Sequence, residues 1–219
     1  MWPFQRKSKP VYPEFIQRYQ ELTFLPDRLQ SISDGKYIVI DCESTGIDKQ
    51  ASIITIGAVT LCQHEIKLEE VLDVRLSLMA SSKEAEIHGE LSDQLEILEI
   101  DQMRKVLQYI KNAILVGHHV SFDIQLINRW FQKEFPGFKL LNPSVDTLAM
   151  IRRVDPQRME RQVAGHDGFQ LDRLCKEYDI AVENRHTALG DAYMTAQLFH
   201  KLSLTLEKRG VTLVKQIIR

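Results

Sequence analysis

The sequence predicts an α/β fold in which a mixed sheet of about five strands is flanked by helices. Runs of β-branched residues dominate residues 37–76, and amphipathic helical periods alternate with short apolar runs after residue 95. Strands that come first, followed by helices alternating with strands, are typical of such a sheet. The composition, 44% hydrophobic and 26% charged over 219 residues, fits one ordinary globular domain with an appendage.

Three strands are expected close together, over residues 37–42, 52–61 and 66–76. The dipeptide Asp34-Gly35 is typical of a turn and leads into the first of them. Parallel pairing would need long crossover connections, and the segments between these strands are too short for a helix. The three strands should therefore form an antiparallel meander.

Helices and strands alternate in the next part of the chain. Apolar residues at steps of three and four predict a helix over 95–110, and a short apolar run predicts a buried strand over 114–117. A second helix is expected over 122–135, ended by Pro136-Gly137, and an edge strand over 144–148 should run into a further helix. These later strands add the parallel part of the sheet.

The last third begins with residues 152–168, which contain four arginines and little periodicity. We interpret this segment as a substrate-facing loop, with a solvated charged loop as the alternative. A short helix over 171–178 and a long one over 188–208 complete the prediction.

Residues 1–35 are predicted to be an N-terminal extension, separate from the main domain over 36–219. Four prolines interrupt it, and a short helix over 14–24 is expected to pack on the outside of the domain. Docking of a partner by this helix is the alternative.

Composition also narrows the class of function. A net charge of −2 argues against a protein that coats nucleic acid through lysine and arginine. Three widely spaced cysteines are expected as reduced thiols rather than as zinc ligands. The chain has no run of 18 apolar residues and no apolar segment behind its charged N-terminus, so we expect neither a membrane span nor a signal peptide, and a cytoplasmic location.

Two acids, Asp41 and Glu43, end the first predicted strand. Side chains of a strand alternate between its faces, so these two carboxylates should share one face while Cys42 points to the other. Neighbouring carboxylates repel each other and attract a cation, which makes a metal site one interpretation. An edge strand with solvated acids is the alternative.

Asp123 and Asp191 are the next candidates. Ser121 is a good N-cap, which would place Asp123 in a first helical turn just after a strand, although an acid there can serve helix electrostatics alone. His186 and Asp191 are five residues apart, about 500° along a helix, so they converge only if His186 precedes the helix. Thr187 as N-cap would place it there, with a neutral surface histidine as the alternative.

Small residues at Ala188 and Ala192 would let this last helix lie close to the sheet, within reach of the first-strand acids. Together, four acids and a histidine suit two divalent ions held by oxygen ligands and a base that activates water. Oxygen ligands without a thiolate select Mg²⁺ or Mn²⁺ over zinc.

Three ordered segments carry a resemblance to a known family. Asp41-Cys-Glu-Ser-Thr-Gly46, Val116-Gly-His-His-Val-Ser-Phe-Asp123 and Arg185-His-Thr-Ala-Leu-Gly-Asp-Ala192 resemble the three motifs of the DEDDh-type, DnaQ-like 3′–5′ exonucleases. That family includes the proofreading epsilon subunit of bacterial DNA polymerase III. Residues 53–59, 87–89 and 145–147 resemble its secondary signatures, and the resemblance spans roughly 36–205. It implies an RNase H-like fold and release of terminal nucleotides as 5′-monophosphates.

The chain departs from the family pattern at four positions. Cys42 and Ser44 are mild changes beside intact acids. His119 stands where the family usually has asparagine, and Thr55 where it often has glutamate. A histidine at 119 can still donate or accept one hydrogen bond.

The resemblance also implies roles for individual residues. Asp41, Glu43 and Asp191 would hold the first of two Mg²⁺ or Mn²⁺ ions, with Asp41 bridging to the second and Asp123 contributing to it. His186 would deprotonate the attacking water. Contacts to the terminal base and sugar are expected from the following residues: Ser44, Thr45, Gly46, His88, His119 and Phe122.

The leading hypothesis is a metal-dependent 3′–5′ exonuclease acting on single-stranded DNA ends. A trimmer of short RNA is the first alternative, because recognition of a 2′-hydroxyl leaves no sequence signature here. A proofreading or scaffold subunit is the second. Only about 14 residues follow the family match, which argues against a polymerase partner bound through the C-terminus. The sequence leaves the oligomeric state undetermined.

Overall fold

Five strands form one mixed sheet in the order β3-β2-β1-β4-β5. The computed structural model describes residues 11–22, 27, 29–76, 89–158 and 169–218. The elements are α1 (Glu14–Leu22), β1 (Lys36–Ser44), β2 (Ile53–Cys62), β3 (Glu65–Arg75), α2 (Gly89–Ile110), β4 (Ile114–Gly117), α3 (Val120–Glu134), β5 (Ser144–Asp146), α4 (Thr147–Val154), α6 (Leu171–Glu177), α7 (Ala188–Lys208) and a 3₁₀ turn, η4 (Val214–Gln216).

The strand pairing confirms the predicted sheet. β1 pairs antiparallel with β2, and β2 antiparallel with β3, which is the expected meander. β4 pairs parallel with β1 and β5 parallel with β4, so β5 is the edge strand that the sequence predicted. The C-terminal ends of the parallel strands β1, β4 and β5 consequently lie at the same end of the sheet. Functional groups are usually found at this end of parallel strands.

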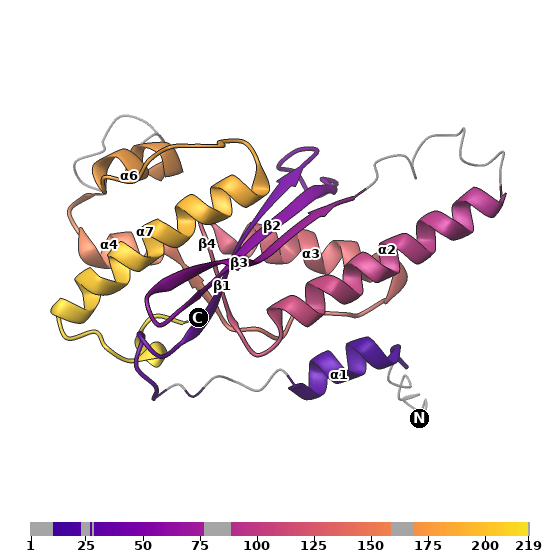
Figure 1. Ribbon diagram of the computed structural model, residues 1–219, viewed down its shortest axis with the longest axis horizontal. Helices are drawn as coiled ribbons and strands as arrows, with labels where there is room; N and C mark the ends of the chain where they lie inside the picture. The colour runs from indigo at the N-terminus through magenta and orange to yellow at the C-terminus, as the bar shows by residue number, and fades with distance from the viewer. Residues whose placement is uncertain (1–10, 23–26, 28, 77–88, 159–168, 219) are drawn as a thin grey trace, which may run out of the picture.

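Two hydrophobic layers cover the sheet, and β1 contributes alternate side chains to each. Ile38, Ile40 and Cys42 join a buried cluster with residues of α1, α2 and α3. Tyr37 and Val39 join a second cluster with residues of α4, α6 and α7. In Figure 1, α4, α6 and α7 gather on one side of the strands and α1 and α2 on the other. Asp41 and Glu43 continue the alternation of the α7 side.

Most predicted helices form, with boundaries that differ at their starts. α2 begins at Gly89 rather than at 95, and α3 begins at Val120 rather than at 122. α7 has the predicted bounds. The loop predicted over 152–168 is partly wrong, because Arg152 and Arg153 belong to the last turn of α4. Its residues 159–168 lie outside the described residues.

The predicted cap of α3 is also wrong. Ser121 is exposed and lies inside the helix, while His119 occupies the N-cap position with a left-handed backbone, φ 67°. Strand β4 ends at Gly117 as predicted, and the short turn after it starts the helix two residues earlier than a Ser121 cap would. Asp123 still falls in the first turn, as expected.

The N-terminal segment is joined to the rest of the protein by buried contacts. Ile16 and Tyr19 of α1 are buried, and the Tyr19 hydroxyl donates to Asn142 Oδ1 at 2.6 Å. Farther on, Ile32 N–H donates to the carbonyl of Thr212 at 2.8 Å. Division of the chain at residue 35 stays a prediction.

Within the described part of the chain, no helix is long and apolar enough to cross a membrane. Its three cysteines, Cys42, Cys62 and Cys175, carry free thiols.

Candidate active site

Asp41 and Glu43 lie at the C-terminal end of β1, opposite Gly57 and Thr55 of β2 in the antiparallel register. The register shifts between Glu43 and Ser44, so the regular pairing ends directly after the second acid. A bulge at this place bends the strand and re-aims the side chains beside it. The two carboxylates are therefore held by a rigid strand up to the point where it ends.

Gly57 lets the start of α7 lie directly on the sheet. A Cβ built on Gly57 would fall 2.1 Å from Leu189 N and 2.2 Å from the carbonyl carbon of Ala188. No side chain fits there, so the backbones of β2 and α7 are in contact. Since Gly57 is paired with Asp41, this contact places the first turn of α7 beside the first-strand acids.

Thr187 caps α7 as predicted. Its Oγ1 accepts a hydrogen bond from Gly190 N–H at 3.1 Å, and its hydroxyl donates to the carbonyl of Asn184 at 2.7 Å. The cap fixes the direction of the first turn and leaves His186 on the preceding loop. Asp191 falls in that first turn and is buried.

Three carboxylates converge at this place. Asp41, Glu43 and Asp191 each offer an oxygen, and these atoms all lie within 4.8 Å of one another. Asp191 Oδ1 is buried and has no hydrogen-bond partner among the described residues. Burial and the nearby charges of Asp191 and Glu43 raise the pKa of Asp41 to about 7. Three crowded acids with an unsatisfied oxygen form a donor set that fits a hard divalent cation.

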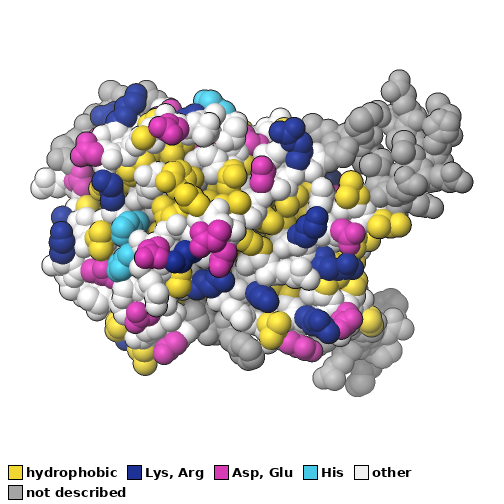
Figure 2. Space-filling view, in the orientation of Figure 1, with side chains coloured by type: hydrophobic (Ala, Val, Ile, Leu, Met, Phe, Trp, Pro, Cys, Tyr) yellow, Lys and Arg dark blue, Asp and Glu magenta, His cyan; other side chains and the backbone are white. Residues whose placement is uncertain are grey.

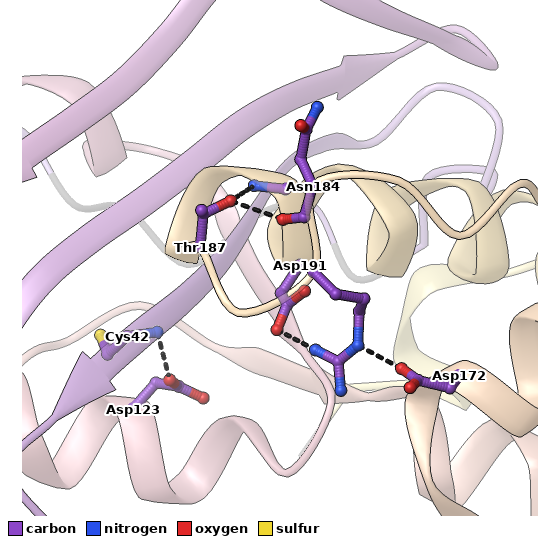
Figure 3. Close-up of polar contacts among 8 residues, drawn as sticks. Cys42, Asp123, Asp172, Asn184, Thr187 and Asp191 are labelled. Carbon is purple, nitrogen blue, oxygen red and sulfur yellow. Dashed lines mark hydrogen bonds and ion pairs between the residues drawn. The ribbon is translucent and has the colours of Figure 1, made fainter.

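Asp123 lies beside these acids but has a different partner. Its Oδ1 accepts a hydrogen bond from the backbone N–H of Cys42 at 2.9 Å, which ties the start of α3 to β1 (Figure 3). Burial first, and then the charge of Asp41, raise the pKa of Asp123 well above its usual range. The structure therefore places Asp123 next to Asp41 and outside the three-carboxylate group.

His186 is exposed and has a left-handed backbone, φ 62°. It lines a groove of about 1360 Å³ together with Glu43, and the groove continues between the strand pair β2–β3 and α7. Exposed apolar side chains of Leu68, Val71 and Tyr193 border it. Figure 2 shows hydrophobic side chains gathered on the face where these elements meet.

The predicted substrate contacts fall into different settings. Ser44 donates its hydroxyl to the carbonyl of Gly46 at 2.6 Å, and Thr45 Oγ1 accepts from Ser52 N–H at 3.0 Å. Both hydroxyls thus close the loop after β1. Phe122 is half-buried and packs against the core, and His119 is exposed. His88 lies outside the described residues.

His118, which the sequence did not single out, is the better-connected of the two neighbouring histidines. Its Nδ1 lies 2.8 Å from Thr147 Oγ1 and its Nε2 lies 2.6 Å from the carbonyl oxygen of Phe169. Burial lowers its pKa, so its ring is neutral near pH 7. It joins the turn after β4 to the starts of α4 and α6.

Sequence reasoning missed two residues of the site itself. Gly57 had a usable signal, since an isolated glycine inside a β-branched strand often marks a close backbone approach. Arg185 contacts Asp172 and Asp191 through its guanidinium, and nothing in its local sequence predicts those partners.

Known proteins resemble this chain in sequence and in fold. A family model described as exonuclease, RNase T, matches residues 38–199. DNA polymerase III subunit epsilon of Aquifex aeolicus is 28% identical over 181 residues, covering 78% of this chain and 82% of that protein. The PolC-type DNA polymerase III of Thermotoga petrophila is 29% identical over 192 residues, which cover 85% of this chain and 13% of the polymerase. This chain thus spans a small part of that relative.

Among solved structures, the nuclease domain of 3′hExo, a DEDDh family member bound to rAMP, superposes with a TM-score of 0.54. The match covers 85% of this chain and 96% of that domain at 15% identity. At this identity the likeness shows the fold, and it confirms the RNase H-like sheet that the sequence resemblance implied.

Proposed function

We propose a reaction for this chain from the premise that it belongs to the DEDDh, DnaQ-like exonuclease family. The chain is a metal-dependent 3′–5′ exonuclease that releases nucleoside 5′-monophosphates from single-stranded DNA. The observation that carries the proposal is the convergence of Asp41, Glu43 and Asp191 within 4.8 Å. These acids come from two elements, β1 and α7, that are distant in sequence and are brought together by the contact at Gly57. A pair of solvated acids on an edge strand would need no such convergence.

The donor set fits divalent metal ions. Asp41, Glu43 and Asp191 would hold one ion, with the orphan Oδ1 of Asp191 as one of the ligand atoms. Asp123, which lies next to Asp41, would support a second ion. Bound Mg²⁺ or Mn²⁺ would neutralise charge on the scissile phosphate and on the leaving 3′-oxygen.

His186 would accept the proton of the attacking water. It lies on the loop immediately before the α7 cap and lines the same groove as Glu43, so both can face one phosphate. It lies outside the helix, so its backbone is not held by the helical hydrogen bonds of α7. We expect metal and substrate to order this loop more than strand β1.

DNA is favoured as the substrate because the relatives similar over most of this chain are named as DNA polymerase subunits or DNA polymerases. The groove that leads away from Glu43 could receive a single strand, with Tyr193 available for stacking on a base. RNA is the second candidate, favoured by the rAMP bound to the structural neighbour.

The test is digestion of a 5′-labelled single-stranded DNA oligomer with Mg²⁺ or Mn²⁺. We expect a ladder that shortens from the 3′ end, 5′-monophosphate products, and no reaction with EDTA. Asp41→Asn should abolish the ladder. Asp48→Asn is the matched control. Asp48 is an exposed acid in the loop after β1 whose side chain accepts from Gln50 N–H, and an asparagine can accept the same bond.

Side-by-side digestion of RNA and DNA of equal sequence decides between the two substrates. Faster release from RNA would replace DNA as the proposed substrate while leaving the reaction unchanged. Full activity of Asp41→Asn would contradict the proposal for both substrates.

Association with a polymerase is a second, separate proposal. The expectation against such a partner came from the short C-terminus, and the names of the similar proteins give that expectation no support. Binding should be tested with the full chain and with residues 1–10 removed. A longer truncation would delete Ile16 and Tyr19, which are buried in the core.

A further inference from the structure

Arg185 bridges two acids that belong to different helices. Its Nε donates to Asp172 Oδ1 at the start of α6, and its Nη1 donates to Asp191 Oδ2 in the first turn of α7. The dashed lines that end at Asp172 and Asp191 in Figure 3 mark these two contacts. The side chains of Arg185 and Asp191 keep only 24% and 8% of their exposure, so this is a partly buried ion pair rather than a solvated one.

The contacts of Asp191 divide its two oxygens between two purposes. Oδ2 accepts from Arg185, while Oδ1 is buried and has no hydrogen bond within the described structure. A carboxylate that is anchored through one oxygen cannot rotate freely, so its other oxygen keeps a fixed direction. Arg185 therefore holds Asp191 through Oδ2 and leaves Oδ1 available to a cation.

Arg185 is also the residue next to His186 on the loop before α7. The backbone on either side of it is left-handed, with φ 51° at Asn184 and φ 62° at His186. The Thr187 hydroxyl ties down the carbonyl of Asn184. With its side chain anchored on α6 through Asp172, the arginine fixes the loop as well as the carboxylate.

We propose that Arg185, anchored by Asp172, is a positioning residue that orients the Asp191 carboxylate for metal binding and holds the His186 loop over the site. The inference rests on the proposed nuclease function and adds to it a residue that would contact a metal ligand, Asp191, rather than the metal itself. Partners of this kind typically alter metal affinity or activity by about 10 to 100-fold. An ordinary ion pair that only joins α6 to α7 would instead affect stability alone.

The experiment measures Mn²⁺ binding to the nucleotide-free protein by calorimetry, and kcat and KM on single-stranded DNA separately. Arg185→Gln should weaken Mn²⁺ binding and lower kcat by about 10 to 100-fold, with KM changed by less than about threefold. Arg185→Lys should recover part of the loss, because it keeps the charge but cannot bridge two acids with a planar fork. Asp172→Asn should produce a smaller loss of the same kind.

Arg173→Gln is the matched control. Arg173 is an arginine of α6 that pairs with Glu177 at 3.1 Å and is 55% exposed. We expect this variant to keep wild-type Mn²⁺ affinity and kcat. If Arg185→Gln does not fold, Asp172→Asn carries the test, because it removes only the anchor.

Unchanged Mn²⁺ affinity and kcat in the Arg185 and Asp172 variants, with a lower unfolding temperature, would overturn the inference and leave a structural ion pair. Tighter Mn²⁺ binding would overturn it as well, by showing that the guanidinium competes with the metal. A wild-type protein that binds Mn²⁺ and degrades no nucleic acid would refute the proposed function, while the affinity comparison still decides the role of Arg185. A wild-type protein that does not bind Mn²⁺ would overturn both.

Discussion

The first turns of α3 and α7 each place an aspartate beside strand β1, but the two aspartates have different hydrogen-bond partners. Asp123 and Asp191 are both buried acids of a first helical turn. The charge of Asp191 raises the pKa of Asp41, and the charge of Asp41 raises the pKa of Asp123. Asp123 accepts from a backbone N–H of β1. Asp191 accepts from the Arg185 guanidinium and keeps one oxygen without a partner.

The difference shows that position on a helix does not decide what an acid can do. A backbone N–H leaves Asp123 without a neutralising charge, and its pKa rises through burial. The Arg185 guanidinium instead supplies Asp191 with a counter-charge next to Asp41 and Glu43. The α7 turn therefore keeps one carboxylate oxygen without a hydrogen-bond partner in the described structure, while the α3 turn uses a carboxylate oxygen to join its helix to the sheet.

Replacing each of these two aspartates should produce the largest effect, on metal binding and catalysis. Asp191→Asn should lower kcat at least about 10³-fold and remove measurable Mn²⁺ binding at the first site, because it takes away one of three converging carboxylates. Asp123→Asn should lower kcat by at least about tenfold and keep that first binding event. Equal loss of Mn²⁺ binding in both variants would show that the two acids act as one unit.

A second comparison concerns the two glycines at which the starts of α7 and α3 approach other parts of the chain. Gly57→Ala would drive a Cβ into the α7 backbone at 2.1 Å, whereas Gly117→Ala would meet the Val120 side chain at 3.0 Å near the start of α3. We expect Gly57→Ala to destabilise the protein by about 1 to 3 kcal/mol or more and Gly117→Ala by less. Urea unfolding of both variants checks the order, and nuclease activity should fall with Gly57→Ala. Similar unfolding midpoints would contradict the close approach at Gly57.

The raised pKa of Asp41 predicts a pH effect on the metal-free protein. An acid whose pKa rises on folding, from 3.8 to about 7, binds its proton more tightly in the folded state. Its contribution to stability is full below pH 3.8 and is lost as the pH rises to about 7.

Unfolding temperatures in EDTA between pH 5 and 8 measure this effect. Asp41→Asn cannot titrate, so it should lose less stability than the wild type over that range and be a few degrees more stable at pH 8, at about 2 to 4 °C per kcal/mol. Added Mn²⁺ should restore the wild type and leave the variant unchanged. Parallel pH profiles would show that Asp41 titrates normally.

The smallest expected effect separates the two caps. Thr187→Ala removes the acceptor for Gly190 N–H and should cost about 1 kcal/mol. Ser121→Ala should change stability by less than about 0.5 kcal/mol, because Ser121 is exposed and does not cap α3. Thermal unfolding of the two variants measures the difference. A larger loss of stability in Ser121→Ala than in Thr187→Ala would support Ser121 as the cap of α3, as the sequence predicted.

Local patterns predicted much of this protein. The alternation of β1 placed Asp41 and Glu43 on one face, and the Thr187 cap placed His186 before α7, because both are decided within a few residues. The prediction was wrong at Ser121, because α3 begins directly after the short turn from β4 and His119 takes the N-cap position.

The sequence by itself determined the order of the elements and the identity of the acids, because period and capping are properties of neighbouring residues. Only the tertiary structure decided which donor each acid meets. Cys42 N–H reaches Asp123, and Arg185 reaches Asp172 and Asp191, through packing of segments far apart in the chain. The partner of a buried carboxylate decides which of its oxygens is bonded, and such partners are chosen by the fold as a whole.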